Sequence, residues 1–294
     1  MSRRPRSVVT GAGGFAGTWL CRELVGRGHA VWGWVRRPPA RPVPGVRYAV
    51  VDLTHADACA AAIARSDPQR LFHLAARTWP REAERQPERC HAVNVTGTAN
   101  VFGALPPSAR ALYVSTAHVY GPPEALPLRC GQPLRPAGVY ARSKAEGERV
   151  ARAARPDCVI ARSFHHSGPG QQTRFVLADW NAQVVGGQRR LSVGDLTIAR
   201  DFLDVRDVVR AYRLILDRAA PGQTLNVCAG HAVPLGALLG WMVGGRPVAI
   251  EVDPARLRPG EVRTMTGDNQ ALRALGWRQR ISLRQMVRDM QRRA

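Results

Sequence analysis

The sequence predicts an α/β protein with a doubly wound parallel sheet and a second, smaller lobe. The run Ser7 to Thr10 is rich in β-formers and leads straight into the glycine turn 11–17 and the helical stretch 18–25. Strand, glycine turn and helix in this order open a sheet of this kind. With 294 residues, 45% of them hydrophobic, the chain is long enough for two closely joined lobes. Further strands are expected at 30–35, 46–51, 71–76, 111–114 and 158–162.

Charge and composition exclude several classes of protein. The formal net charge is +21, but the arginines are spread along the chain instead of forming one basic, aromatic-rich patch, so we expect no nucleic-acid surface. No apolar run is long enough to span a bilayer and no signal-peptide core follows Met1, which predicts a cytoplasmic protein without a membrane partner. The six scattered cysteines predict reduced thiols and no metal site.

The glycine turn is the first candidate binding site. Gly11, Gly14 and Gly17, with Phe15 between the last two, lie between the first strand and the first helix. Glycines at this spacing let the turn close, let a pyrophosphate approach the backbone and let the helix pack on the strand. Because the flanking strand and helix are both present, the turn predicts a dinucleotide site rather than a structural turn.

The ends of the next two strands indicate which dinucleotide binds. The second strand ends in Val35 and is followed by Arg36 and Arg37, where sites for NAD usually carry an acidic residue. Two arginines suit a 2′-phosphate, so we expect NADPH in preference to NADH, with NADH still possible. The third strand ends in Asp52 and Leu53, which we place at the adenine ring.

The fourth strand, 71–76, ends in small residues, and Ala75 there lets the nicotinamide half of the cofactor lie close. His73 is interpreted as a packed histidine. A helix carrying 93–101 follows, in which Asn94 is expected to brace neighbouring backbone rather than touch substrate.

A tyrosine and a lysine form the candidate catalytic pair. Lys144 is the only lysine among 43 basic side chains, and Tyr140 lies four residues before it. On a helix the two share one face. The pKa of a phenol is about 10, and a nearby cation lowers that pKa toward the range useful for proton transfer. Thr116, at the carboxyl end of the fifth strand, points a hydroxyl at the ligand crevice.

These motifs resemble the extended short-chain dehydrogenase/reductases that act on nucleotide sugars. The resemblance covers nearly the whole chain, and it is carried by 10–17, by 115–121, and by Tyr140 with Lys144. It implies that Thr116 orients the substrate oxygen, that Tyr140 is the acid/base, and that Lys144 holds the nicotinamide ribose. It also implies a homodimer and two lobes: an NADP-binding Rossmann domain of 1–162 plus about 200–230, and a nucleotide-sugar-binding lobe of about 163–199 plus 231–294.

The second lobe resembles one subgroup of that family, which contains GDP-mannose 4,6-dehydratases and GDP-4-keto-6-deoxymannose reductases. The stretch 163–172 is similar to that of the subgroup, with His165 where the subgroup has asparagine, and 193–210 and 253–261 followed by 267–269 also resemble it. The resemblance implies a substrate contact at His165, diphosphate contacts at Arg200 and Arg258, and a ribose contact at Glu261.

Ketone reduction is the reaction that the sequence favours. A 4,6-dehydratase of this family needs an acidic residue just after the threonine, and a 3,5-epimerase/reductase uses a cysteine there, whereas this chain has Ala117 and His118. We therefore expect NADPH-dependent reduction of the 4-keto group of an NDP-4-keto-6-deoxyhexose, with GDP favoured and dTDP next. Two alternatives stay open: a nucleotide-sugar 4-epimerase with tightly bound NAD, and a non-catalytic cofactor sensor or scaffold.

Overall fold

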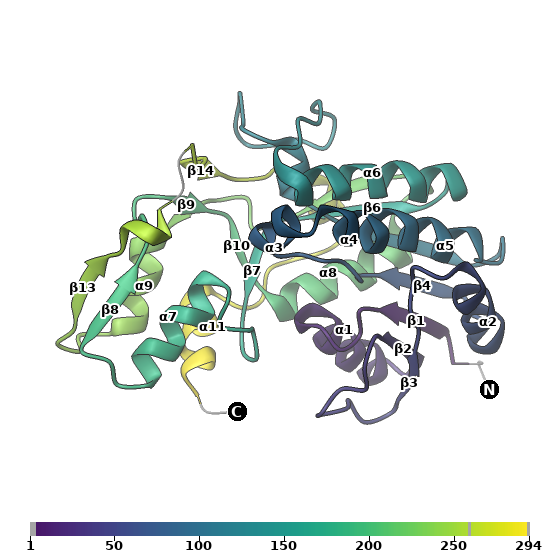
Figure 1. The fold of residues 1–294 in the computed structure, drawn as a ribbon, viewed down its shortest axis with the longest axis horizontal. Helices are drawn as coiled ribbons and strands as arrows, with labels where there is room; N and C mark the ends of the chain where they lie inside the picture. The colour runs from purple at the N-terminus through teal and green to yellow at the C-terminus, as the bar shows by residue number, and fades with distance from the viewer. Residues whose placement is uncertain (1–3, 258–259, 293–294) are drawn as a thin grey trace.

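A seven-stranded parallel sheet organises the larger part of the molecule (Figure 1). The computed structural model describes residues 4–257 and 260–292. The strand order is β3-β2-β1-β4-β5-β6-β11, so the chain changes direction between β1 and β4, and a ligand crevice opens at the carboxyl ends there. The bounds are β1 Arg6–Thr10, β2 Ala30–Val35, β3 Val46–Val50, β4 Arg70–His73, β5 Arg110–Thr116, β6 Val159–Ser163 and β11 Thr224–Val227.

Helices cover both faces of this sheet, and each face has its own apolar core. On one face α1 (Phe15–Gly26) and α8 (Val205–Arg218) pack against the strands through side chains such as Leu20 and Val208. On the other face lie α2 (Ala56–Ser66), α5 (Gly97–Gly103) and α6 (Gly138–Ala154), with Phe102 in the core. Because both faces are covered, the strands are nearly continuous apolar runs, as parallel sheets require.

The helix expected over 93–101 is interrupted. The short helices α3 (Pro80–Arg85) and α4 (Pro87–His91) lead into a π-helical turn, Ala92–Thr96, and only then into α5. Asn94 lies buried in that turn, accepts a hydrogen bond from the Arg77 amide at 2.8 Å and donates one to the Arg77 carbonyl at 3.2 Å. This confirms that Asn94 braces neighbouring backbone.

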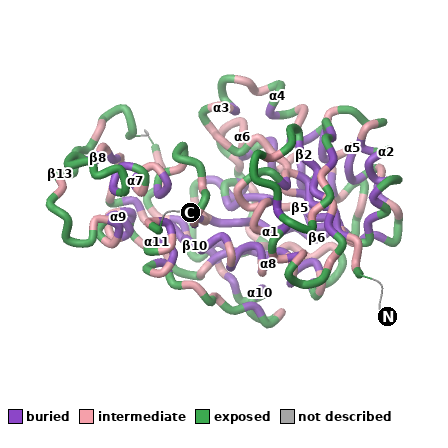
Figure 2. Tube along the Cα trace, turned by 90° about the horizontal axis from the view of Figure 1, so that it is seen from below, coloured by how far each residue is buried: buried purple, intermediate pink, exposed green. Residues whose placement is uncertain are grey.

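The smaller lobe is built around the helices α7 (Val176–Val185), α9 (Leu235–Val243) and α11 (Leu283–Gln291), which share a core with the strand β8 (Arg190–Val193). The strand β13 (Ala249–Val252) pairs with β8 and is exposed along its whole length (Figure 2). Short strands join the lobe to the sheet domain: β7 (His165–Ser167) with β10 (Phe202–Asp204), and β9 (Ala199–Arg200) between β12 (Val233–Pro234) and β14 (Thr264–Met265). The remaining helix is α10 (Gln270–Ala274).

One buried carboxylate connects the segments at the junction of the lobes. Asp201 follows β9 and is fully buried. It accepts hydrogen bonds from the amides of Ala229 at 2.6 Å, Gly230 at 2.9 Å and Gly267 at 3.3 Å, and from the Thr266 hydroxyl at 3.2 Å. Since these partners come from the end of β11 and from the C-terminal segment, Asp201 fixes both relative to β9. We propose that the boundaries between the two domains are those expected from the sequence.

Candidate functional site

The glycine turn forms a cradle between β1 and α1. Gly11 has a φ of +69°, and a Cβ on Gly17 would lie 2.1 Å from the Gly11 carbonyl oxygen. Helix α1 begins after Gly14 without a side-chain cap, so its first amide groups are available to an anion. A turn in which a Cβ on Gly11 or Gly17 would clash with backbone, and a helix that starts without a side-chain cap, fit the pyrophosphate of a dinucleotide.

The neighbouring strand β4 ends against the same turn. The Thr10 hydroxyl accepts hydrogen bonds from the amides of Leu74 and Ala75, both at 3.1 Å, which places Ala75 beside Gly11. His73 lies between the hydroxyls of Thr10 at 3.0 Å and Thr98 at 3.1 Å. Burial, with a smaller contribution from Lys144, lowers the pKa of His73 to about 3. His73 is therefore a neutral, packed histidine, as expected.

Arg36 and Asp52 come together at the far end of the crevice. Both are exposed and follow β2 and β3, whereas Leu53 is buried. Hydrogen bonds from Thr54 lower the pKa of Asp52, and the charges of His55 and Arg36 act in the same direction. The Arg36 guanidinium therefore lies within electrostatic reach of the group placed at the adenine. Its assignment to a 2′-phosphate stays a prediction.

Thr116, Tyr140 and Lys144 meet where β5 ends and α6 begins. Thr116 is the last residue of β5, and its hydroxyl is close enough to hydrogen-bond Tyr140. Lys144 is 3% exposed, and its ammonium lies 4.0 Å from the centroid of the Tyr113 ring. Tyr113 was not anticipated; it forms the floor of the site and its hydroxyl donates to the Lys144 carbonyl at 3.3 Å. The three expected catalytic residues are thus brought together.

The expected lowering of the Tyr140 pKa by Lys144 is not borne out, because burial has the larger effect. Burial raises the pKa of Tyr140 to about 12, and the interaction that opposes this is the hydrogen bond with Thr116. Burial also lowers the pKa of Lys144 from 10.5 to about 7, while Glu148 acts in the opposite direction. The ammonium lies over the Tyr113 ring, 4.0 Å from its centroid.

Beside Tyr140 the structure places a row of aromatic rings. His118 lies edge-on to Tyr140, with 6.1 Å between ring centroids, and 5.6 Å from His165, which in turn lies 5.4 Å from Phe202. His165 is the residue expected to contact substrate. In the sequence, His118 served only to argue against a dehydratase, which would have a carboxylate there. Its place beside Tyr140 depends on the turn Ala117–Tyr120 after β5, in which the His118 amide donates to the Thr116 hydroxyl at 3.3 Å.

The other expected substrate residues lie in the second lobe. Arg200 is buried and pairs with Glu261 at 3.1 Å, while its guanidinium also donates to the carbonyls of Ala199 and Arg263. The diphosphate and ribose candidates are therefore neighbours. Arg258, the remaining diphosphate candidate, lies outside the described residues.

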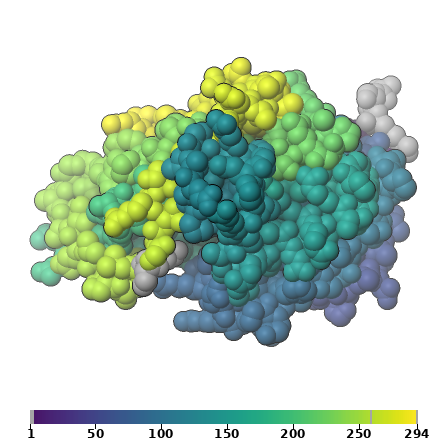
Figure 3. All heavy atoms as spheres, turned by 90° about the horizontal axis from the view of Figure 1, so that it is seen from above, coloured from purple at the N-terminus to yellow at the C-terminus, as the bar shows by residue number. Residues whose placement is uncertain are grey.

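The segment 122–137, between β5 and α6, covers this region. Seen from above, its dark teal surface lies against the yellow C-terminal segment, over the junction of the two lobes (Figure 3). Its Leu128 amide donates to the Thr266 carbonyl at 2.9 Å, and the Asp268 amide donates to the Leu128 carbonyl at 2.8 Å. The segment therefore borders both the catalytic turn and the nucleotide end of the candidate site.

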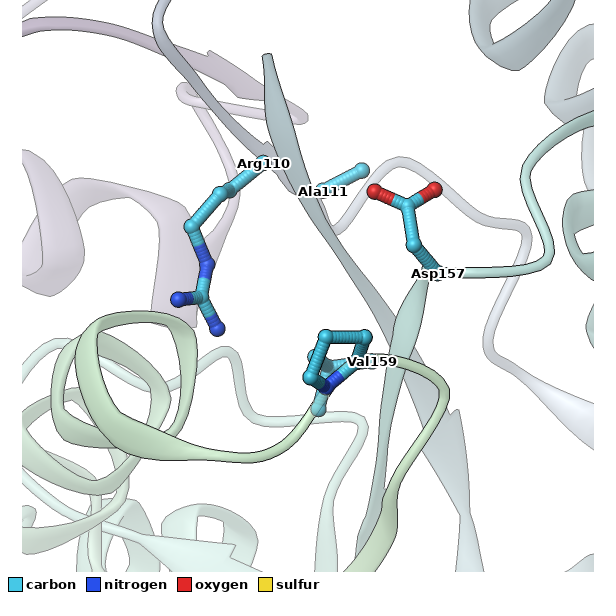
Figure 4. A pocket seen from close by; sticks show the side chains of 5 residues that line it. Arg110, Ala111, Asp157 and Val159 are labelled. Atoms are coloured by element: carbon cyan, nitrogen blue, oxygen red, sulfur yellow. The ribbon is translucent and has the colours of Figure 1, made fainter. Parts of the chain in front are cut away.

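A separate cavity of about 190 Å³ lies at the opposite edge of the sheet (Figure 4). Arg110 and Ala111, at the start of β5, line it together with Asp157, Val159 and Pro221. It is at the amino ends of the strands, away from Thr116, and so is not part of the catalytic region. Within 4–257 and 260–292 no cluster of three or more His, Cys, Asp or Glu is arranged to hold a metal ion, and no helix there is long and apolar enough to cross a membrane.

Fold and site together define an NAD(P)-binding α/β enzyme of the extended short-chain dehydrogenase/reductase type. Comparison with known families supports this: the model of the NAD dependent epimerase/dehydratase family matches residues 7–228. The chain belongs to that family. The expectations for the fold class and the family are thereby confirmed.

The chain is similar to several characterised members over nearly its full length. It is 33% identical to the GDP-6-deoxy-D-mannose reductase of Pseudomonas aeruginosa, over 96% of this chain and 95% of the relative. It is 30% identical to the UDP-glucose 4-epimerase of Mycolicibacterium smegmatis, with 95% of each covered. Among solved structures, RMD from Pseudomonas aeruginosa complexed with NADPH has a TM-score of 0.84 and 30% identity, with 97% of each chain covered.

Proposed function

We propose that this protein is an NADPH-dependent reductase of the 4-keto group of a nucleotide-diphosphate 4-keto-6-deoxyhexose. The observation that carries the proposal is the Thr116, Tyr140 and Lys144 constellation, which lies at the carboxyl edge of the sheet with the His118 imidazole beside Tyr140 and the His165 imidazole beside His118. The similarity to a GDP-6-deoxy-D-mannose reductase over nearly the whole chain supports it.

The proton of the reaction comes from Tyr140. NADPH, when bound, supplies the hydride that C4 of the sugar receives. Thr116 holds the C4 oxygen, and Tyr140 donates a proton to the alkoxide that forms there. The Thr116 hydroxyl is close enough to hydrogen-bond Tyr140, so the two hydroxyls can contact one substrate oxygen. Lys144 restores the tyrosine proton and holds the nicotinamide ribose. A phenol with a raised pKa is a weak acid alone, so Tyr140 needs Lys144 as the source of the proton that replaces the one it donates.

Other chain residues hold the rest of the two ligands. The cradle of Gly11, Gly14 and Gly17 with Phe15 binds the pyrophosphate, Ala75 leaves room for the nicotinamide half, and Arg36 selects the 2′-phosphate, with NADH as the weaker donor. Asp52 and Leu53 lie at the adenine.

For the substrate, the sugar lies at His165 and the diphosphate at Arg200 and Arg258, with the nucleotide ribose at Glu261. Before the substrate binds, the ion pair with Glu261 holds Arg200 in place. GDP is the favoured nucleotide and dTDP the second. As in the resemblance, we propose a homodimer.

A 4-epimerase is the second candidate, because the chain is also 30% identical to a UDP-glucose 4-epimerase. Such an enzyme keeps NAD bound through its cycle, and Arg36 after β2 argues against that cofactor. A third candidate, a non-catalytic sensor, is disfavoured because both Tyr140 and Lys144 are present in catalytic positions.

The test is consumption of NADPH with GDP-4-keto-6-deoxymannose, dTDP-4-keto-6-deoxyglucose or UDP-galactose as substrate. The proposal expects NADPH loss with one of the ketosugars and none with UDP-galactose. Interconversion of UDP-galactose and UDP-glucose without added cofactor would instead establish the epimerase. The Tyr140→Phe variant is the negative control. Its matched comparison is Tyr48→Phe, which removes a hydroxyl that accepts a hydrogen bond from the Val43 amide.

A further inference from the structure

A buried ion pair lies one helical turn beyond Lys144. Glu148 and Arg162 are 5% and 7% exposed, and the guanidinium donates to both carboxylate oxygens, Nε to Oε1 at 3.0 Å and Nη2 to Oε2 at 2.8 Å. Paired bonds of this kind fix the direction of both groups. Since Glu148 is on α6 and Arg162 on β6, the pair also holds the catalytic helix to the sheet.

The remaining bonds of this pair are satisfied by a network that reaches the nucleotide side of the site. Arg162 also donates to the Tyr120 hydroxyl at 3.2 Å and to the Cys130 carbonyl at 3.1 Å. Tyr120 donates to Asn226 at 2.6 Å, and Asn226 donates to the Leu128 carbonyl at 2.8 Å. A buried network with all its members bonded is rigid.

The charge of Glu148 acts on Lys144 and raises the pKa of the lysine against the larger effect of burial. Residues four apart on a helix face each other, and both side chains are buried. The other groups that bear on the ammonium are the Tyr113 ring below it from β5, the His73 imidazole from β4, which burial keeps neutral, and Cys90 from α4, whose effect on the Lys144 pKa has the same direction as that of Glu148 but is smaller. Tyr140, on its own helix, is a neutral phenol. Beyond Glu148 lies the Arg162 cation, which competes for the same carboxylate.

We propose that Glu148, clamped by Arg162, is a positioning residue whose carboxylate is the buried counter-charge of Lys144. This proposal rests on the proposed function in one respect: the reductase mechanism gives Lys144 its role in proton transfer. A buried ammonium with no anion beside it gives up its proton, because desolvation penalises the charged form. Neutral Lys144 would have no proton to return to Tyr140. The Glu148 carboxylate therefore favours the charged form of Lys144 in a site where burial alone would favour the neutral amine.

The chain allows a direct test, because Lys144 is its only lysine. Protein grown with ¹³C-labelled lysine gives one side-chain Cε signal, and the pH dependence of that signal reports the protonation of Lys144 whether or not any substrate is turned over. In Glu148→Gln we expect the titration midpoint to move at least one pH unit lower than in the parent protein, about a tenfold loss in proton affinity. Glu146→Gln is the matched control: the same change on the same helix, at a partly exposed residue that pairs with His91 and Arg149. Its midpoint should stay within about 0.3 unit.

A second variant keeps the test decisive if Glu148→Gln does not fold. Arg162→Gln removes the competing cation, so the proposal expects the midpoint of Lys144 to rise. An unchanged midpoint in either folded variant, or equal shifts in Glu148→Gln and Glu146→Gln, overturns the assignment. With a 4-ketosugar as substrate, the alkaline limb of kcat/KM should move to lower pH in Glu148→Gln, with KM for the sugar unchanged. If the parent protein reduces no ketosugar but the lysine signal moves as expected, the proposed function fails and the counter-charge stands.

Discussion

Replacing Lys144 with methionine should make the protein more stable while it abolishes activity. Burial lowers the pKa of Lys144 from 10.5 to about 7, and the effect of Glu148 is already included in that value. At about 1.36 kcal/mol per pKa unit, this lowering of the pKa corresponds to roughly 5 kcal/mol of destabilisation from the buried charge. Partial relaxation and the loss of the cation–π contact with Tyr113 reduce the expected gain to about 2–4 kcal/mol.

The gain should depend on pH in a defined direction. The folded-state pKa is depressed, so the penalty is complete below pH 7, shrinks between 7 and 10.5 as only the unfolded chain still binds the proton, and vanishes above that range. Urea unfolding of the parent protein and of Lys144→Met at pH 6.5 and pH 9 measures the difference in their free energies of unfolding. The advantage of the variant should be larger at pH 6.5. Arg142→Met, at an exposed position on the same helix, is the control and should change the free energy of unfolding by less than about 0.5 kcal/mol.

A lower stability of Lys144→Met than of the parent at both pH values would refute this reasoning. It would mean that the lysine contributes more through packing than its charge costs. An equal gain at the two pH values would also contradict it, because the pH dependence is the signature of a buried charge.

The remaining predictions concern the catalytic tyrosine and the cofactor cradle. Tyr140→Phe should lower kcat roughly 10²–10⁴-fold, as expected for loss of a general acid, with NADPH binding by fluorescence titration unchanged; a loss under tenfold would remove Tyr140 from its role. Arg36→Ala should raise KM for NADPH at least roughly tenfold and leave KM for NADH nearly constant, measured side by side; equal changes would mean that Arg36 does not read the 2′-phosphate. Gly17→Ala should abolish NADPH binding, since its Cβ would lie 2.1 Å from the Gly11 carbonyl oxygen, whereas Gly13→Ala, with its nearest neighbour at 3.5 Å, should bind normally.

Features that depend on local spacing were predictable from the sequence. The glycine turn is recognisable because each glycine has a steric reason for its position, and Tyr140 and Lys144 share a face because helical periodicity requires it. Thr116 follows from the rule that the carboxyl ends of parallel strands face the ligand crevice.

Features that depend on distant partners were not predictable. The strand β11 joins the sheet beside β6 after 60 intervening residues, and nothing in Thr224–Val227 alone specifies that neighbour. Arg162 is one of many arginines, and only the fold shows that it is the one that pairs with Glu148. The high pKa of Tyr140 arises from burial, which the motif does not encode.

The measurement that bears most directly on the central claim is NADPH oxidation with GDP-4-keto-6-deoxymannose and dTDP-4-keto-6-deoxyglucose, using the parent protein and Tyr140→Phe in parallel. The account expects steady NADPH loss with one ketosugar, slower loss with NADH, and a collapse of the rate in the variant. No NADPH loss with either ketosugar, from protein shown to bind NADPH, would contradict the assignment as a 4-ketoreductase.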